Sequence, residues 1–336
     1  MSNIDRKQAT TAFEEYVSAY DPANPRIALK IDHTMRVAGL CERIAREEGL
    51  PPDDIELAWL LGLLHDIGRF EQVRRYDTFN DAQSVNHATF GAQVLFEGER
   101  NMGKEGECDI GKSANSFEAP SRETPSGTSH AMPANACMPK ALPRVADAQD
   151  AAPFGLTAQE GNALSEHPQY SMASSHAHAA LIREFIANPC HDGLIRTAVE
   201  MHNVYRLPDG LDARTRTLCN VLRDADKIDI LKVNCTLPIQ DIYGIPESAM
   251  TGSALSPACI EHFYQKECLP RGVRQHPADV FLGHLCFAWE LVFDASLRIA
   301  REQGHLRSML DRTWEDPSTQ RAFAEMAAFM TTELHL

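Results

Sequence analysis

The apolar run over residues 55–64 constrains the fold of this 336-residue chain more than any other feature. A helix over this run would be apolar on nearly all sides, so it would lie deep in the core, with Asp53 and Asp54 as candidate N-caps. His65 and Asp66 follow the run directly. Two ionisable side chains at the end of a buried helix need a partner, because an unpaired buried charge is costly. A metal ion is the most economical partner for this pair.

The remaining chain is also patterned mainly for helices. Apolar residues recur at helical spacing over residues 11–48 (with a break near 21–25), 84–97, 176–187, 193–201, 214–231, 280–302 and 318–334. A stretch bearing Pro and Gly, residues 237–257, interrupts the pattern. No alternating segment long enough for a β-strand and no internal repeat is present. The pattern therefore predicts an all-α fold.

Composition changes abruptly after residue 98. Residues 99–169 are rich in Gly, Ser, Pro, Ala and Asn, contain few branched aliphatic residues and follow no sustained period. This composition predicts a long, flexible and disordered insertion. We expect residues 10–98 and 170–240 to form the two parts of the helical core, and residues 241–336 to form a helical C-terminal region that packs on it.

Charge and composition exclude several classes of function. With a formal net charge of -15, the chain is a poor match for long nucleic acid or an anionic membrane. No stretch approaches the roughly 18 consecutive apolar residues of a membrane span, and the first residues lack the apolar core of a signal peptide, so a cytoplasmic location is expected. The nine cysteines are scattered and form no CxxC pair, which argues against a disulfide framework or a structural zinc site.

Other ionisable residues fall on or at the ends of the predicted helices. They are His33, His87, His202 and the acidic cluster at residues 224–229, DADKID. In a helical bundle, imidazole and carboxylate groups from different helices can converge on a divalent cation although they lie far apart in sequence. Each histidine taken singly is more often a satisfied core or surface residue than a ligand. The pair His65-Asp66 is the exception because of its place after a buried helix.

Three segments together resemble the HD-domain superfamily of metal-dependent phosphohydrolases: DHTMRVAGL at residues 32–40, LLGLLHDIGRF at 60–70 and LRDADKIDIL at 222–231. The order His, His-Asp and a distant Asp gives that family its name. The resemblance covers about residues 20–98 and 175–236. It implies an HD-domain helical bundle.

The resemblance also implies a first metal site made of His33, His65, Asp66 and one Asp of the acidic cluster. It favours Asp226, the Asp directly before the lysine. Asp224 and Asp229 would then be neighbours, one accepting a hydrogen bond from a ligand and the other stabilising the helix or forming an ion pair. From the residues alone, the choice among the three carboxylates stays open.

His87 and His202 resemble the additional histidines of HD enzymes that bind two metal ions, several phosphodiesterases among them. In that arrangement Asp66 would bridge the two ions. The alternative gives both histidines structural or substrate-contacting roles. The cofactor would be one or two divalent ions, and imidazole and carboxylate donors suit Mn, Fe, Ni, Zn or Mg almost equally.

The resemblance implies hydrolysis of a phosphomonoester or phosphodiester by metal-activated water, with Asp66 at the centre of the catalytic site. Lys227 and Arg69 are candidates for neutralising phosphate oxygens, and a surface salt bridge is the alternative for both. Asn203 is a candidate for binding a water or a substrate hydroxyl, and a helix cap is its alternative. The acidic charge favours a nucleotide or another small phosphorylated metabolite as substrate.

Two rival functions use the same residues. A catalytically idle HD domain would bind a nucleotide and regulate a partner, but it would lack ligands that are all present here. A di-iron oxygenase would hold iron with a similar set of His and Asp. Two further motifs carry little weight: GxxxxGKS at residues 106–113 lacks the flanking strand and helix of a phosphate-binding loop, and His191-Asp192 is typical of a turn and helix cap. The sequence predicts no oligomeric state.

Overall fold

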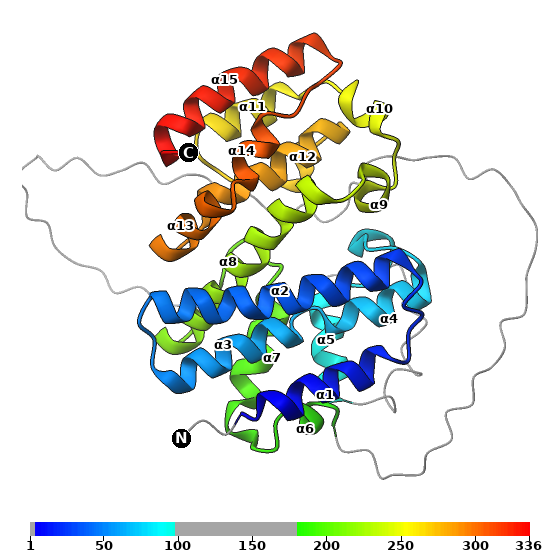
Figure 1. Cartoon of the computed structure of the whole chain (residues 1–336), viewed down its shortest axis with the longest axis vertical. Helices are drawn as coiled ribbons and strands as arrows, with labels where there is room; N and C mark the ends of the chain where they lie inside the picture. Colours follow the sequence, from blue (N-terminus) through cyan, green and yellow to red (C-terminus); the bar gives the residue numbers. More distant parts are fainter. Residues whose placement is uncertain (1–3, 98–179) are drawn as a thin grey trace, which may run out of the picture.

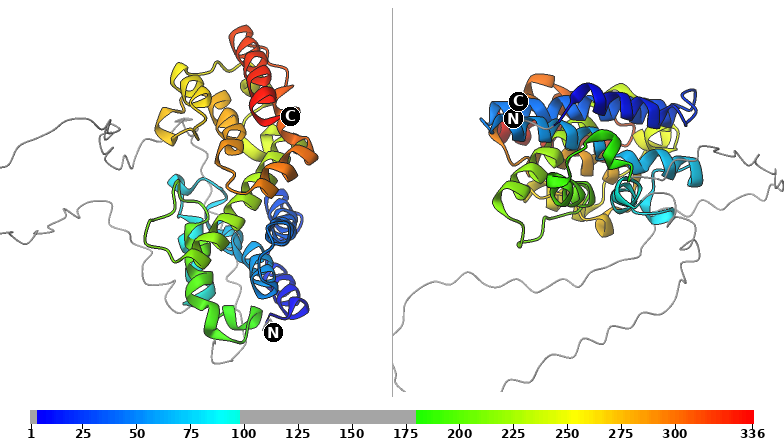
Figure 2. Two further views of the ribbon diagram at one scale, coloured as in Figure 1. Left: turned by 90° about the vertical axis from the view of Figure 1, so that its left-hand side faces the viewer. Right: turned by 90° about the horizontal axis from the view of Figure 1, so that it is seen from below.

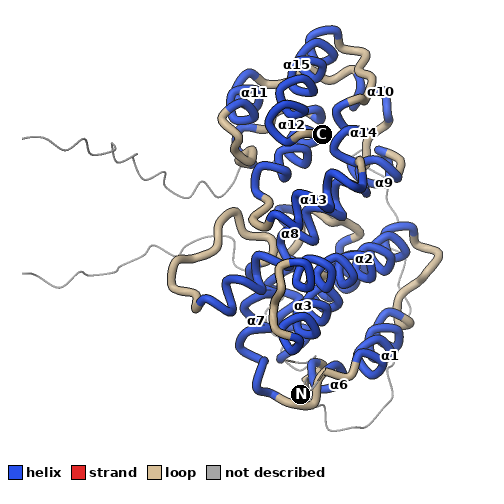
Figure 3. Tube along the Cα trace, turned by 60° about the vertical axis from the view of Figure 1, so that its left-hand side comes forward, coloured by secondary structure: helices blue, strands red, loops and turns tan. Residues whose placement is uncertain are grey.

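The computed structural model describes residues 4–97 and 180–336, and these residues form helices and loops without any β-strand (Figure 3). The expected all-α fold is confirmed. In chain order the α-helices are α1 (Arg6–Val17), α2 (Pro25–Glu47), α3 (Pro52–Leu64), α4 (Ile67–Tyr76), α5 (His87–Phe96), α6 (Ile182–Phe185), α7 (Asp192–Met201), α8 (Ala213–Thr236), α9 (Ile239–Tyr243), α10 (Glu247–Thr251), α11 (Pro257–Tyr264), α12 (Pro277–Leu285), α13 (Asp294–Gln303), α14 (His305–Leu310) and α15 (Pro317–Leu334). Short 3-10 helices are η1 (Asp81–Gln83), η3 (Pro189–His191), η4 (Arg271–Val273) and η5 (Cys286–Glu290).

The helices form two groups that are joined by α8 (Figure 1). Helices α1 to α7 lie at one end of the molecule and α9 to α15 at the other, and the 24-residue α8 runs from one group into the other. The left view of Figure 2 shows the same elongated arrangement. Helix α8 packs against α2, α3 and α7 in the first group and against α12, α13 and α14 in the second. The expected helical C-terminal extension is thus present.

Helix α3 lies in the centre of the first group, as its apolar run predicts. Every residue from Leu57 to Leu64 is buried, and the helix packs against α2 and α8. Its predicted N-caps are wrong by two or three positions, because the N-cap residue is Pro51. The helix begins at Pro52 because a proline is well suited to the first helical position, and Asp53 and Asp54 lie in the first turn, where the helix dipole favours negative charge.

Two glycines allow neighbouring helices to approach closely around the end of α3. A Cβ atom on Gly62 would lie 2.6 Å from Cα of Ala38 on α2. A Cβ atom on Gly68, in the first turn of α4, would lie 2.5 Å from the carbonyl oxygen of His87 and 2.6 Å from the backbone nitrogen of Gly91 on α5. The second contact brings the start of α5, and with it His87, beside the start of α4.

The structure departs from the sequence prediction at several places. Helices α4, α9, α10, α11 and α14 occupy residues for which no helix is predicted, and the single helix predicted over residues 280–302 is divided into α12, η5 and α13. The division has a local cause. The backbone N–H groups of Val292 and Phe293 donate to Oδ2 of buried Asp224 on α8, at 2.9 and 3.2 Å. These groups are available because the chain leaves the helix at that point.

The predicted insertion at residues 99–169 and the GxxxxGKS pattern at 106–113 lie outside the described residues. In the described part of the chain, no helix is both long enough and apolar enough to cross a membrane.

Candidate metal centre

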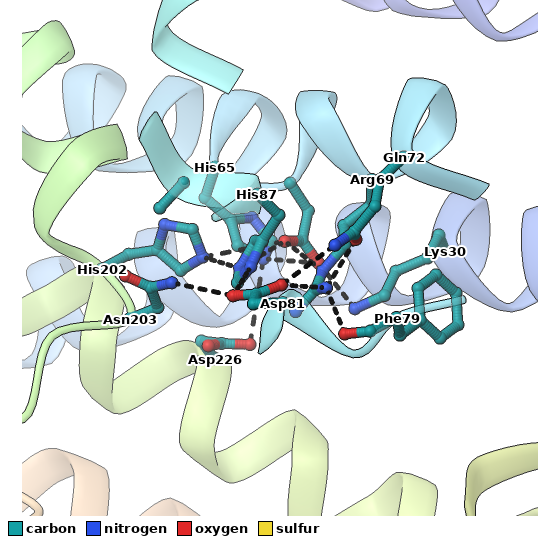
Figure 4. Close-up of polar contacts among 12 residues, drawn as sticks. Lys30, His65, Arg69, Gln72, Phe79, Asp81, His87, His202, Asn203 and Asp226 are labelled. Atoms are coloured by element: carbon teal, nitrogen blue, oxygen red, sulfur yellow. Dashed lines mark hydrogen bonds and ion pairs between the residues drawn. The ribbon is translucent and has the colours of Figure 1, made fainter. Parts of the chain in front are cut away.

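All six side chains that the sequence predicts as metal ligands come together in the first group of helices. They are His33 on α2, His65 and Asp66 between α3 and α4, His87 at the start of α5, His202 directly after α7, and Asp226 on α8. Figure 4 shows His65, His87, His202 and Asp226 gathered at one point where these helices meet. Asp226 has 17% of its side chain exposed, whereas the other five are buried. Among the six side chains, Asp226 is therefore the one with most contact with solvent.

Asp66 lies between two groups of imidazoles and turns one carboxylate oxygen toward each. Its Oδ2 lies 3.5 Å from Nε2 of His33 and 3.5 Å from Nε2 of His65. Its Oδ1 lies 3.6 Å from Nε2 of His87 and 3.7 Å from Nε2 of His202. Each triad therefore offers donor atoms within 4.8 Å of one another, which is close enough for one metal ion.

Asp226 adds a carboxylate to the first of these triads. Its Oδ1 lies 3.2 Å from Nε2 of His33 and 3.8 Å from Nε2 of His65. The first group thus contains two imidazoles and two carboxylates, and the second contains two imidazoles and the shared Asp66.

Two of the imidazoles are oriented by backbone carbonyl groups. Nδ1 of His65 lies 2.8 Å from the carbonyl oxygen of Gly62, and Nδ1 of His202 lies 2.7 Å from that of Val199. A carbonyl oxygen can only accept a hydrogen bond, so Nδ1 carries the hydrogen in both rings. In the neutral ring, Nε2 then presents its lone pair to the cluster.

The other two imidazoles are oriented by carboxylates. Nδ1 of His33 lies 2.7 Å from Oδ2 of Asp229, and Nδ1 of His87 lies 2.7 Å from Oδ2 of Asp81. Histidine ligands of metal ions commonly donate their second nitrogen in this way, which fixes the ring and makes the coordinating nitrogen more basic.

The Nε2 atoms consequently face each other in pairs. The distance between Nε2 of His33 and Nε2 of His65 is 3.3 Å, and that between Nε2 of His87 and Nε2 of His202 is 3.0 Å. When all four hydrogens reside on Nδ1, no hydrogen lies between the paired lone pairs, and they repel. A cation between the two nitrogens removes this repulsion, so the donor set fits a bound metal ion.

The charges around the cluster keep its ligands in the forms that bind metals. Burial alone would raise the pKa of Asp66, but the Lys30 ammonium, 2.6 Å from Oδ2, and the nearby imidazoles hold it well below its usual range. Burial and the positive charge of Arg69 lower the pKa of His87 to about 3. At neutral pH the cluster therefore presents an ionised Asp66 and a neutral His87.

For His33, in contrast to His87, the surroundings raise the pKa. Burial and Lys30 would lower its pKa, but hydrogen bonds to Asp226 and Asp229 outweigh them and raise it. A positive charge is thus favoured at this end of the cluster.

Two of the three predicted substrate-binding residues border the cluster but are engaged with other protein groups. Nη1 of Arg69 donates to the carbonyl oxygen of Phe79 at 2.8 Å and to Oδ1 of Asp81 at 3.0 Å, while its Nε lies 3.7 Å from Oδ1 of Asp66. Nδ2 of Asn203 is 3.2 Å from Oδ1 of Asn86, the N-cap residue of α5. Arg69 and Asn203 therefore support the walls of the cluster (Figure 4).

The third, Lys227, points elsewhere. It follows Asp226 on α8, but its Nζ forms an ion pair with Oε2 of Glu290 at 2.8 Å. Successive residues on a helix project about 100° apart, so a lysine directly after an inward-facing ligand faces a different neighbour. The predicted contact of Lys227 with substrate is not supported by this geometry.

The sequence analysis missed three side chains that contact either a candidate ligand or the carboxylate that orients one. Lys30 pairs with Asp66, and its position three residues before His33 places both on one face of α2. Arg36, three residues after His33, binds both oxygens of Asp229 at 2.6 and 2.9 Å. Helical spacing could have identified these two residues. Asp81 lies in a stretch without periodicity, and no signal in the sequence marks it.

The family comparison agrees with this geometry. Residues 31–133 match the family model of the HD domain, which confirms the resemblance to the HD-domain superfamily. The match contains His33, His65, Asp66 and His87, and it extends into residues that the structure does not describe. No curated protein and no solved structure matches the chain.

Proposed function

We propose that the protein is a metal-dependent phosphohydrolase whose site holds two divalent cations, one on each side of Asp66. The observation that carries the proposal is the facing of two pairs of Nε2 atoms at 3.3 and 3.0 Å, with one carboxylate oxygen of Asp66 beside each pair. A neutral core histidine with its hydrogen on Nδ1 needs no such arrangement, because its Nε2 would accept a hydrogen bond from a donor group.

In this proposal the first cation is held by His33, His65, Asp66 and Asp226, and the second by Asp66, His87 and His202. The second group has fewer protein donors, which leaves more positions open to water and substrate. Cations held by these residues would supply Lewis-acid chemistry, by polarising phosphoryl oxygens and making water a better nucleophile near neutral pH. No protein nucleophile is required.

Lys30 takes the phosphate-binding role in place of Lys227. Its ammonium lies 2.6 Å from Asp66 and 5.3 Å from the centre of the Phe79 ring, and it is partly exposed. A lysine here can neutralise a phosphoryl oxygen that reaches the cluster, since its flexible side chain can move from one anion to another. Arg69 holds Asp81, and through Asp81 it positions His87.

The substrate in this proposal is a small phosphorylated molecule, either a monoester or a diester. Access on the side of Asp226 and Lys30, the partly exposed members of the site, suits a compact phosphate group. The net charge of -15 disfavours long nucleic acid at the same site.

The test is to measure metal content and hydrolysis of 4-nitrophenyl phosphate and bis(4-nitrophenyl) phosphate. The protein is stripped and reloaded with Mn, Fe, Ni, Zn or Mg, as wild type and as Asp66→Ala. Asp192→Ala is the matched control, because Asp192 belongs to the chain's other His-Asp pair and lies in an ion pair with Arg183. We expect metal-dependent hydrolysis that is lost in Asp66→Ala and retained in Asp192→Ala.

Other outcomes would contradict the proposal in distinguishable ways. Bound metal without hydrolysis of either ester would favour a regulatory binder, and oxygen uptake by the iron-loaded protein would favour an oxygenase. Failure of the wild type to bind any of the metals would refute the metal centre itself.

A further inference from the structure

A cavity of about 400 Å³ is lined in part by Lys227, which points away from the metal centre. Basic side chains gather around this cavity, although the molecule as a whole is acidic. Five basic residues line it: Arg206, Arg216, Arg223, Lys227 and Lys266. Only two acidic residues, Glu267 and Glu290, share its walls. None of the six side chains of the metal centre lines this cavity, which we call the basic pocket.

One face of α8 forms the floor of the basic pocket. Arg216, Asn220, Arg223 and Lys227 are spaced by four, three and four residues, so all four project from the same side of the helix. The segment after α7 supplies Tyr205 and Arg206, and the far wall comes from the C-terminal group of helices. Three separate segments thus bring cations to one concave surface.

The two acidic residues already have partners within the protein. Oε2 of Glu290 pairs with Lys227 at 2.8 Å, and Oε2 of Glu267 pairs with Nδ1 of His262 at 3.0 Å. Within residues 4–97 and 180–336, neither Arg206 nor Arg216 forms an ion pair. Arg216 donates to the carbonyl oxygen of Pro208 at 2.6 Å. Two guanidinium groups therefore keep their positive charge available for an anion in the pocket.

An aromatic surface lies beside these charges. The Tyr205 ring is 48% exposed, and the guanidinium carbon of Arg206 lies 5.6 Å from its centre. A large exposed aromatic side chain in the same pocket as two arginines suits a ligand that combines a phosphate with a planar ring. The cavity volume falls within the range of small-molecule sites.

We propose that the basic pocket binds a small phosphate-bearing anion, with the phosphate on Arg206 and Arg216 and any planar ring on Tyr205. The site is distinct from the metal centre, and its existence does not depend on the proposed hydrolysis. The phosphate can belong to an inorganic pyrophosphate or to a nucleotide, and the two sources differ in whether Tyr205 contributes to binding.

Isothermal titration calorimetry of the full chain in the presence of a metal chelator tests this proposal without any enzymatic activity. Pyrophosphate and ADP are titrated into the wild type and into Arg206→Gln/Arg216→Gln. The control is Arg43→Gln/Arg307→Gln, which removes the same charge from two exposed residues elsewhere. We expect binding to the wild type and the control, and at least a tenfold loss of affinity in the pocket variant. A melting curve checks that each variant is folded.

Further variants identify the site and the ligand. Asp66→Asn should leave anion binding unchanged, and Arg206→Gln alone should weaken it. If ADP binds more tightly than pyrophosphate and Tyr205→Ser removes that difference, the ligand is a nucleotide; equal affinities indicate recognition of phosphate alone. The proposal is overturned if neither anion binds, if the pocket variant binds as tightly as the control, or if Lys30→Gln rather than the pocket variant abolishes binding.

Discussion

At His33 and His87, a carboxylate accepts the Nδ1 hydrogen, whereas His65 and His202 donate to backbone carbonyl groups. The orientation of His33 or His87 can therefore be disturbed by replacing Asp229 or Asp81, without replacing any candidate ligand. Asp81 is the more informative partner, because it contacts His87, Arg69 and Gln72 at once. The orientation of His87 therefore depends on a side chain outside the cluster.

We predict that Asp81→Ala lowers metal affinity about 10-fold to 100-fold, with the loss confined to the site that contains His87. The ring of His87 would lose the acceptor that fixes its orientation and raises its basicity. Calorimetric titration of the metal-free protein with the metal should show one weakened site and one unchanged site. Asp311→Ala removes an exposed carboxylate as a control. Equal weakening of both sites, or of neither, would contradict the prediction.

The sequence was sufficient to identify the candidate ligands that the structure brings together, but not the residues around them. His33, His65, Asp66 and Asp226 follow from the resemblance, since the order of ligands is a property of the chain. Lys227 shows the limit of this reasoning. Adjacency to Asp226 in the sequence suggested a shared site, but adjacent residues on a helix face different surroundings.

At the scale of helices, the site depends on how closely α4 and α5 approach. Gly68 contacts the backbone of α5 at a distance that no side chain would permit, and this places His87 next to Asp66. The apolar run predicted α3 correctly because burial on all sides has a plain signature in the sequence. The missing prediction of α4 and the division of residues 280–302 both reflect tertiary contacts, which periodicity does not contain.

We predict that Gly68→Ala destabilises the protein by about 1–3 kcal/mol and weakens metal binding at His87. The added methyl group would meet backbone atoms at 2.5 and 2.6 Å, and backbone cannot move aside as a flexible side chain can. Gly39→Ala is the control, because Gly39 lies within α2 and has open space around its Cβ position. Urea denaturation of both variants measures the difference. An equally stable Gly68→Ala protein would show that α4 and α5 can separate at little cost.

At the scale of the whole molecule, stability rests partly on polar groups where α8 meets the second group of helices. The ring of His284 on α12 stacks on Tyr243 of α9, and its Nδ1 lies 3.2 Å from Nδ2 of Asn234 on α8. Burial, together with the positive charge of Arg274, lowers the pKa of His284 to about 3 from its ordinary value of 6.5. This histidine therefore joins three helices in its neutral form.

We predict that the free energy of unfolding falls at acidic pH because His284 is buried in its neutral form. Between pH 6.5 and about 3 the unfolded chain binds a proton that the folded chain does not. The stability present above pH 6.5 is consequently lost as the pH falls through this window, by up to about 1.4 kcal/mol per pH unit from this group. His284→Gln should show a shallower decline in the free energy of unfolding between pH 7 and pH 4, measured with urea. The control is His335→Gln, at an exposed residue, whose free energy of unfolding should decline with pH as in the wild type. If the free energy of His284→Gln declined as steeply as that of the wild type, His284 would not be the group responsible.

The described residues fall into two stretches of chain, and each half of the metal cluster takes ligands from both. His33, His65, Asp66 and His87 precede residue 98, while His202 and Asp226 follow residue 179. Neither stretch alone holds every candidate ligand on either side of Asp66, because Asp226 completes the first group and His202 the second. A metal ion bound by all the residues of one group would link two distant parts of the chain. Tight metal binding would then also show that the two stretches have assembled into one folded core.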